Sequence, residues 1–192
     1  MIEEAMPRTA ASLPYAWPYH GRFDPRATAI LVCSGDRGCD PDGEAVRRLA
    51  RLAGIARQCG VVVIAMPAVG TSPPAILAGD VDATVPRPVF GGFTGTDLSL
   101  VLRDLGRSDL IIAGFPLELG ADCTMREAND LGFECLLVTD CCSSLARDTF
   151  AGAVSSVQMS GGIFGAVASA ADVLDVLRVV TGGISHALTD QV

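Results

Sequence analysis

The sequence contains no lysine, little histidine and an excess of negative charge. All 14 basic residues among the 192 are arginines, two residues are histidines, and the formal net charge is −8. A nucleic-acid surface needs clustered cations to neutralise phosphates, so scattered arginines on an acidic chain argue against that class of partner. A guanidinium stays protonated, so an arginine can grip a carboxylate but cannot shuttle protons.

Long apolar runs and paired cysteine motifs are missing as well. The apolar stretches are short and interrupted by glycine, which argues against a membrane span, and the N-terminus MIEEAMPRTAAS lacks the basic and apolar regions of a signal peptide. The seven cysteines show no Cys-x-x-Cys spacing. We therefore expect a cytoplasmic protein with no disulfide framework, no metal site and no cofactor, because no nucleotide-binding glycine motif stands out either.

The chain is rich in apolar residues, and these follow the spacings of strands and helices. With 49% hydrophobic residues it can bury a full core. We expect one domain over residues 1–192, with an N-terminal arm of about 26 residues and a polar tail from about residue 182. Short apolar runs alternate with helical patterns, which predicts βαβ units and a parallel sheet. The expected strands are 29–33, 61–65, 83–85, 110–113, 135–139 and 163–167, and the expected helices are 41–58, 96–105, 119–131, 147–157 and 170–180.

In an open α/β sheet, ligands bind outside the carboxyl ends of the strands. Ser34, Arg87 and Gly120 each lie just past the end of an expected strand. We therefore expect them to line one site.

Three segments share a pattern with a known family. Residues 27–36, ATAILVCSGD, are similar to an apolar strand ending in Asp-x-Gln, residues 93–98, FTGTDL, to a Phe-x-Gly-Thr-x-Leu element, and residues 124–128, TMREA, to Thr-Ala-x-x-Ala. These elements make the chain resemble the isochorismatase-like family of cysteine hydrolases over roughly residues 13 to 180. The resemblance implies an α/β fold: a doubly wound, three-layer αβα arrangement around a six-stranded, mostly parallel sheet.

The family's catalytic residues are replaced at all three places. Ser34 stands where the family has its acid/base Asp, Asp36 where it has Gln, and Arg87, six residues before Phe93, where it has Lys. Gly120 stands where the family has its nucleophilic Cys. Isochorismatases and related vinyl-ether hydrolases within the family also have glycine there, because they protonate an enol ether instead of forming a thioester.

Asp36 is the nearest carboxylate to the vacated acid position. If the strand continues through Gly35, strand alternation directs Asp36 to the same side as Ser34, where desolvation would make it a general acid. The alternative is a loop aspartate that caps the next turn, and a bend at Gly35 would spoil the alternation.

Arg87 lies between two prolines, which fix its backbone. It is expected either to clamp a substrate carboxylate or to be a surface arginine that pairs with a neighbouring acid.

Gly120 and Ala121 fall near the start of an expected helix, where backbone amides stabilise negative charge. Glu118 either caps those amides or faces the pocket as an acid. The family has a cis peptide just after the strand-ending glycine, so the Phe115-Pro116 bond is expected to be cis. Pro116 and Phe93 complete the expected substrate contacts.

Relocated thiol catalysis is a further alternative, through Cys123, Cys33 or Cys39, but no lysine or nearby histidine is evident to generate a thiolate. The aromatic segment that contains His20 is expected either to fold over the cleft or to pack on the domain or on a neighbouring subunit.

These residues lead to two hypotheses. In the first, the chain is a thiol-independent hydrolase or lyase that acts on a small carboxylated metabolite of a specialised biosynthetic pathway. Asp36, Arg87 and Glu118 would be catalytic, and Ser34, Arg87, Phe93, Pro116, Gly120 and Ala121 would bind substrate. In the second, the chain is an inactive ligand-binding or partner subunit. Either protein is expected to form a homodimer or a higher homo-oligomer.

Overall fold

A six-stranded, all-parallel sheet forms the centre of the computed structural model, which describes residues 9–35, 43–77 and 79–182. The strands lie in the order β3-β2-β1-β4-β5-β6. Their bounds are β1 Thr28–Ser34, β2 Val62–Pro67, β3 Ala83–Thr84, β4 Asp109–Gly114, β5 Glu134–Val138 and β6 Ala166–Ala168. The order reverses direction between β1 and β4, which is the arrangement of a doubly wound sheet.

The central strands are apolar along their whole length because helices cover both faces. Every residue of β1 and of β4 is buried. Continuous apolar runs of this kind are typical of parallel strands that have no solvent-facing side. The buried carbonyl and amide groups are satisfied by the ladders to neighbouring strands, such as Val32 with Ala65 and with Ala113.

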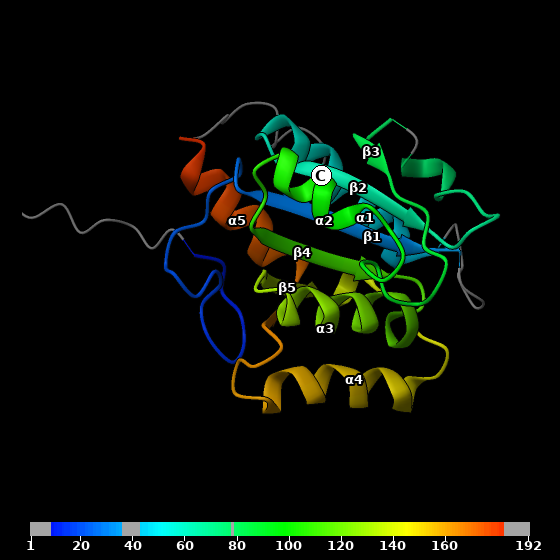
Figure 1. The fold of residues 1–192 in the computed structure, drawn as a ribbon. Coiled ribbons are helices and arrows are strands. Elements are labelled where there is room, and N and C mark those ends of the chain that lie inside the picture. The colour runs from blue at the N-terminus through cyan, green and yellow to red at the C-terminus, as the bar shows by residue number, and fades with distance from the viewer. Residues whose placement is uncertain (1–8, 36–42, 78, 183–192) are drawn as a thin grey trace, which may run out of the picture.

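The helices form the outer layers, with α1 and α5 in contact on one face and α2, α3 and α4 on the other (Figure 1). Their bounds are α1 Glu44–Gln58, α2 Leu98–Asp104, α3 Asp122–Asp130, α4 Arg147–Met159 and α5 Ala170–Val180. Short 3₁₀ turns occur at η1, Ala75–Leu77, and η3, Thr139–Cys141, and a π-helical turn, η2, at Leu117–Ala121. The predicted α/β class and the six parallel strands are thus confirmed.

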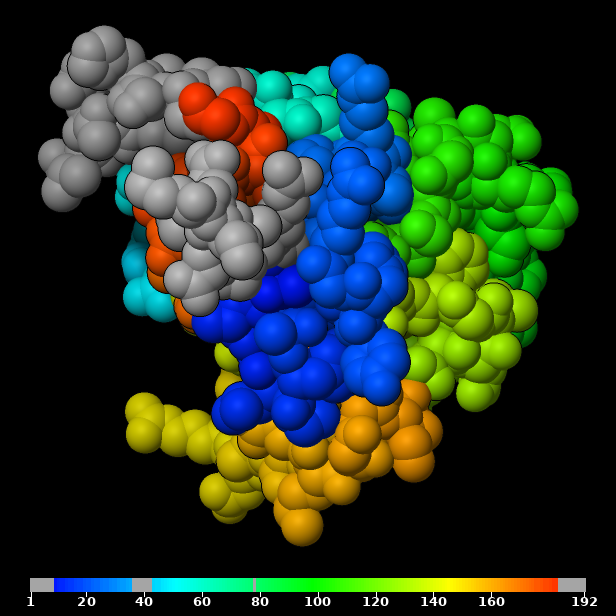
Figure 2. Space-filling view, turned by 90° about the vertical axis from the view of Figure 1, so that its left-hand side faces the viewer, coloured from blue at the N-terminus to red at the C-terminus, as the bar shows by residue number. Residues whose placement is uncertain are grey.

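The N-terminal arm lies across the amino ends of the strands (Figure 2). It pairs with the sheet edge, where Leu13 and Val167 exchange two backbone hydrogen bonds. Trp17 is fully buried and packs edge-on against Phe23, with ring centroids 5.7 Å apart. The arm therefore adds to the core at the end of the sheet opposite to the strand termini that were predicted to bind ligand.

Most element boundaries agree with the sequence to within a few residues. The final helix matches at both ends, and helix α1 begins at Glu44, while the expected start at residues 41–42 lies outside the described part. The largest difference is at the expected helix 119–131, which is a π-helical turn from Leu117 followed by α3.

Candidate functional site

The carboxyl ends of β1, β2 and β4 form the edge where the candidate residues gather, and we call it the carboxyl edge. Ser34 is the last residue of β1, and Pro116, Gly120 and Ala121 follow the end of β4. Arg87 follows β3 and pairs with Ala68, just after β2. The structure thus places Ser34, Arg87 and Gly120 at or past strand ends, and that they line one site stays a prediction.

Arg87 is fully buried, with 1% of the residue exposed, and its guanidinium binds backbone carbonyl groups. Nε donates to the Met66 carbonyl oxygen at 2.8 Å and Nη2 to that of Ser34 at 3.0 Å. Nη1 donates to the carbonyl oxygens of Val89 at 3.2 Å and Phe90 at 2.6 Å. One side chain thus joins the ends of β1 and β2 to the loop after β3.

These contacts bear on the two roles expected for Arg87. It is not a surface arginine, because the side chain is buried at the carboxyl edge. Four donor contacts to carbonyl groups give it a structural role, and a carboxylate clamp stays a prediction. Burial and nearby acids raise the pKa of the Cys123 thiol, and the charge of Arg87 offsets this only slightly.

The chain bends sharply after Ser34. Gly35 has a φ of +84°, and a Cβ there would lie 2.0 Å from the Thr71 hydroxyl oxygen and 2.9 Å from the Ala68 amide nitrogen. Only glycine fits this turn without strain. Asp36 was expected to share the side of Ser34 only if the strand continued through Gly35. Strand β1 ends at Ser34, so this condition is not met. Asp36 itself lies outside the described residues.

The exit of β4 has the backbone features of a site. The Phe115-Pro116 peptide is cis, as predicted. A π-helical turn from Leu117 to Ala121 follows, and such turns occur often at functional sites. Gly120 and Ala121 are buried within this turn, so the position of the family's cysteine lies inside the protein and holds no side chain.

Glu118 stabilises the start of α4. Its carboxylate accepts a hydrogen bond from the Thr149 hydroxyl at 2.6 Å and another from the Leu145 amide at 3.3 Å. Partial burial acts to raise the pKa of Glu118, but these hydrogen bonds and one from its own amide outweigh it, and the pKa lies below its ordinary value. The carboxylate thus binds its own amide in the turn after β4 as well as Leu145 and Thr149 around the start of α4, and a lowered pKa makes Glu118 a poor proton donor.

The described contacts of the Phe93 ring and amide are with Phe133 and Glu127. Its ring packs on Phe133, with centroids 5.4 Å apart, and Phe133 directly precedes the amino end of β5. The Phe93 amide donates to the carboxylate of Glu127, near the end of α3, at 2.8 Å. The described contacts therefore give Phe93 a packing role and do not support the expected substrate contact.

The cysteines are poorly placed for catalysis. Burial raises the pKa of the Cys123 thiol, the charges of Asp122 and Glu127 raise it further, and Arg126 and Arg87 only partly offset them. Burial also raises the pKa of the other thiols with a clear shift, Cys59, Cys135, Cys141 and Cys142. A nucleophilic thiol needs a lowered pKa, so these environments argue against relocated thiol catalysis. Cys39 lies outside the described residues.

The buried Cys33 thiol has a hydroxyl neighbour. Its sulfur lies 3.3 Å from the Thr124 hydroxyl oxygen on α3. This contact joins β1 to the helix that packs on it.

His20 and its aromatic neighbours anchor the arm at the amino edge of the sheet. His20 Nε2 lies 3.1 Å from the buried carboxylate of Asp109, and the Tyr15 hydroxyl donates to Glu134 at 2.9 Å. Asp109 and Glu134 are the first residues of β4 and β5 and are partners in register. The described part of the arm therefore packs on its own domain, and the alternative in which it folds over the cleft is wrong.

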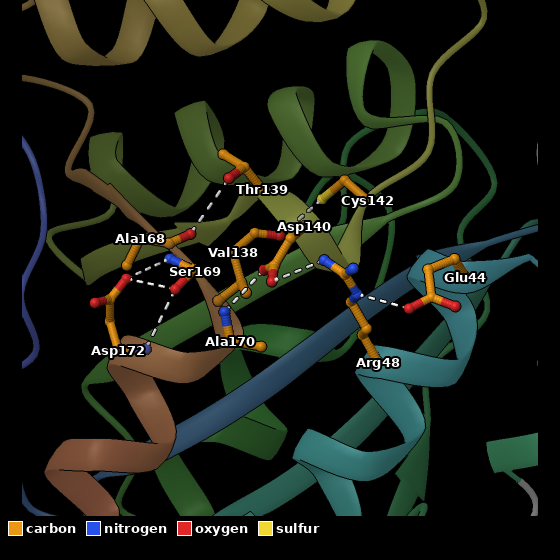
Figure 3. A network of polar contacts seen from close by, with 10 residues as sticks. All are labelled: Glu44, Arg48, Val138, Thr139, Asp140, Cys142, Ala168, Ser169, Ala170 and Asp172. Atoms are coloured by element: carbon orange, nitrogen blue, oxygen red, sulfur yellow. Dashed lines mark hydrogen bonds and ion pairs between the residues drawn. The ribbon is translucent and has the colours of Figure 1, made fainter.

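A polar network that was not predicted from the sequence lies beyond β5 (Figure 3). Asp140 accepts a hydrogen bond from the Ala170 amide at 2.8 Å and forms an ion pair with Arg48 at 3.4 Å. Ser169 and Asp172 complete a capping box at the start of α5. The network holds the turn after β5, Thr139–Cys141, against α1 and α5. The residues that follow this turn include Ser143, which binds Gly114 at the end of β4.

Two further observations concern the class of protein. Among the described helices, none combines the length and apolar character needed to cross a membrane. The described residues also include no cluster of three or more histidine, cysteine or acidic side chains arranged to hold a metal ion.

Solved structures with the same fold come from several bacteria. An isochorismatase family protein of Burkholderia thailandensis superposes with a TM-score of 0.66 and 25% identity, over 81% of this chain and 97% of that one. A cysteine hydrolase of Pseudomonas syringae pv. phaseolicola gives a TM-score of 0.72 at 19% identity, over 88% and 97% of the two chains. At that identity the second likeness shows the fold alone.

Sequence comparison points the same way. The isochorismatase family protein YwoC of Bacillus subtilis is 37% identical over 75 residues, which cover 39% of this chain and 40% of the relative. The matching segment thus spans less than half the length of this relative. The isochorismatase domain model matches residues 32–172, nearly three quarters of the chain. This chain therefore belongs to the isochorismatase family.

Proposed function

We propose that this isochorismatase-family protein is a thiol-independent hydrolase or lyase that acts on a small carboxylated metabolite at the carboxyl edge. The observation that supports it most is the buried Gly120 in the π-helical turn, where the family has a nucleophilic cysteine. The raised pKa of Cys123, one turn further on, argues against a thiolate at that residue. A biosynthetic pathway for specialised metabolites is the expected setting.

Proton transfer is assigned by elimination among the candidate acids. Glu118 has a lowered pKa and holds α4, and Arg87 cannot release a proton. Asp36 is the remaining candidate, and it follows directly on the turn at Gly35. In an enol ether, Asp36 would protonate the double-bond carbon, and water would add to the resulting cation and return a proton to the Asp36 carboxylate. The neutral hemiketal would then break down to a ketone and an alcohol.

The fixed charge of Arg87 supplies the electrostatic part of the proposal. A buried guanidinium that stays protonated attracts a substrate carboxylate even without direct contact, since charges interact strongly away from water. The backbone contacts of Arg87 hold this charge in one position, so no reorganisation is needed when ligand binds.

A second function is favoured by the contacts of the same two residues. Arg87 and Glu118 both have structural partners, which is what a catalytically inactive ligand-binding protein or partner subunit would retain. In that case the carboxyl edge binds the metabolite and nothing is turned over. Assembly into a homodimer or higher homo-oligomer is proposed for either function.

Turnover and binding measured on the same variants separate the two functions. Wild type and Asp36→Asn are incubated with carboxylated enol ethers, esters and amides, and products are measured by mass spectrometry. For the enzyme we expect product from wild type and a loss of about 10² to 10⁴ in rate for Asp36→Asn. Glu118→Gln is the control and should keep its rate. Ligand binding by both proteins without product from either would establish the inactive function instead.

A further inference from the structure

Two buried hydroxyl groups at the carboxyl edge have no hydrogen-bond partner. Among the described residues, four buried side-chain atoms are unpaired, and two of these are the hydroxyl oxygens of Ser34 and Ser143. The other two, in Trp17 and Arg107, belong to the arm and to the turn before β4, at the opposite end of the sheet. Buried polar groups are nearly always paired, so an unpaired group requires an explanation, such as a ligand or ordered water.

Ser34 is held tightly although its hydroxyl is unpaired. The residue is 1% exposed, and its carbonyl oxygen accepts hydrogen bonds from the Ala68 amide at 2.8 Å and from Arg87 at 3.0 Å. Gly35 turns the chain immediately afterwards. The backbone of Ser34 is therefore fixed on both sides, and the hydroxyl cannot find a partner by a shift of the main chain.

Ser143 is fixed in the same way on the other side of β4. Its amide donates to the carbonyl oxygen of Gly114 at 3.3 Å, and its own carbonyl accepts from the Leu117 amide at 2.8 Å. Both contacts are to the exit of β4 and the start of the π-helical turn. The Asp140 network holds the preceding turn (Figure 3).

The two serines flank the exit of β4. The Phe115 amide donates to the Cys33 carbonyl at 3.0 Å, which places the end of β1 on one side of this exit, and Ser143 binds Gly114 on the other. The π-helical turn with Gly120 begins at the same point. The residues that carry the two unpaired hydroxyls therefore both adjoin the exit of β4, where this turn begins.

We infer that the hydroxyl groups of Ser34 and Ser143 are ligand contacts, and that they donate hydrogen bonds to the oxygen atoms of a bound carboxylate. This inference rests on the proposed function and names the residues that recognise its substrate class. A hydroxyl can donate to a carboxylate oxygen, and a hydrogen bond to a charged acceptor is stronger than one between neutral groups. Without ligand, each unpaired hydroxyl destabilises the fold.

Stability provides the first part of the test, because removal of an unpaired hydroxyl has the opposite effect from removal of a paired one. Ser34→Ala and Ser143→Ala are each expected to raise Tm by about 2 to 4 °C. The matched control is Thr28→Val, at the other end of β1, which removes a buried hydroxyl that donates to the Asp24 carbonyl at 2.7 Å. That variant is expected to lower Tm by a similar amount.

Binding provides the second part, with pyruvate and benzoate as probes and isothermal titration calorimetry as the readout. Wild type and Thr28→Val are expected to bind at least one of these acids with equal Kd. Ser34→Ala and Ser143→Ala are expected to bind it about fivefold to twentyfold more weakly. The neutral analogue benzyl alcohol should bind all four proteins without this difference.

Two results would overturn the inference alone. One is a fall in Tm for both serine variants, which would show that the hydroxyls are already satisfied. The other is a Kd for the acids that is unchanged in both serine variants while wild type binds. Failure of wild type to bind either acid would instead reject the carboxylate class in the proposed function, and the inference would fall with it.

Discussion

The Nη2 atom of Arg87 donates a hydrogen bond to the carbonyl oxygen of Ser34 across 3.0 Å. These two residues stand at the places where the family has its lysine and its acidic residue, and here they meet through side chain and backbone. In this structure the contact fixes the end of β1. Under the proposed function, proton transfer at this edge is assigned to another residue, Asp36.

Replacing Arg87 with lysine should destabilise the protein strongly. An ammonium group cannot reproduce the planar set of donors that reaches four carbonyl groups. We expect Arg87→Lys to lower the free energy of unfolding by about 3 kcal/mol, since hydrogen bonds to charged groups contribute about 1.5 to 3 kcal/mol each and do not add fully. Urea unfolding measures this loss. The control Arg103→Lys, at an exposed site on α2, should stay within about 0.5 kcal/mol of wild type, and an equal effect of both changes would refute a structural role for Arg87.

The stability difference between wild type and Glu118→Gln should depend on pH, because the Glu118 carboxylate stabilises the folded state only when it is charged. The folded-state pKa of Glu118 lies below its ordinary value of 4.5, so its stabilisation is fully present above that value and is lost as pH falls through the folded pKa. We expect wild type to be slightly more stable than Glu118→Gln at neutral pH, by less than about 1 kcal/mol, and this advantage to shrink in acid. Urea unfolding of both proteins across that range is the measurement. An advantage that grows toward low pH would contradict the capping role.

Cys123 should react slowly with mild alkylating agents. Its pKa is raised, by burial first and by Asp122 and Glu127 next, so little thiolate exists at neutral pH. We expect iodoacetamide to modify Cys123 more slowly than free cysteine, with a rate that still increases well above pH 8, as followed by peptide mass spectrometry. Labelling as fast as that of free cysteine at neutral pH would return the relocated thiol to consideration.

Tyr15 should make the protein sensitive to alkali. Burial and the hydrogen bond to Glu134 raise the pKa of its hydroxyl above the ordinary value of 10.0, so the folded state keeps a proton that the unfolded chain loses. Stability is therefore expected to fall as pH rises above about 10. Tyr15→Phe should be less stable than wild type at neutral pH by about 1 kcal/mol and should show less of this alkaline loss. An identical alkaline profile for both proteins would place the cause elsewhere.

Local pattern was enough to predict most of the fold. Apolar runs such as 29–33 and 110–113 became β1 and β4 because strands buried on both faces must be apolar throughout. The resemblance to the family, which has a cis peptide just after the strand-ending glycine, predicted the cis Phe115-Pro116 bond. The π-helical turn at Leu117 was not predicted, because its hydrogen-bond pattern depends on packing against the ends of neighbouring strands.

The positions of the site residues were predictable, but their partners were not. Sequence spacing placed Ser34, Arg87 and Gly120 past strand ends, whereas the carbonyl groups that Arg87 binds come from three separate segments. Glu118 likewise caps a helix that begins far along the chain. Such contacts depend on tertiary packing, for which a single sequence has no local signal.

The central claim is that the carboxyl edge works without a thiol, and the most direct test is turnover of a carboxylated enol ether by wild type, Cys123→Ala and Asp36→Asn, measured by mass spectrometry. We predict that wild type and Cys123→Ala form product at equal rates and that Asp36→Asn loses about 10² to 10⁴ in rate. Loss of product in Cys123→Ala with full activity in Asp36→Asn would contradict the claim.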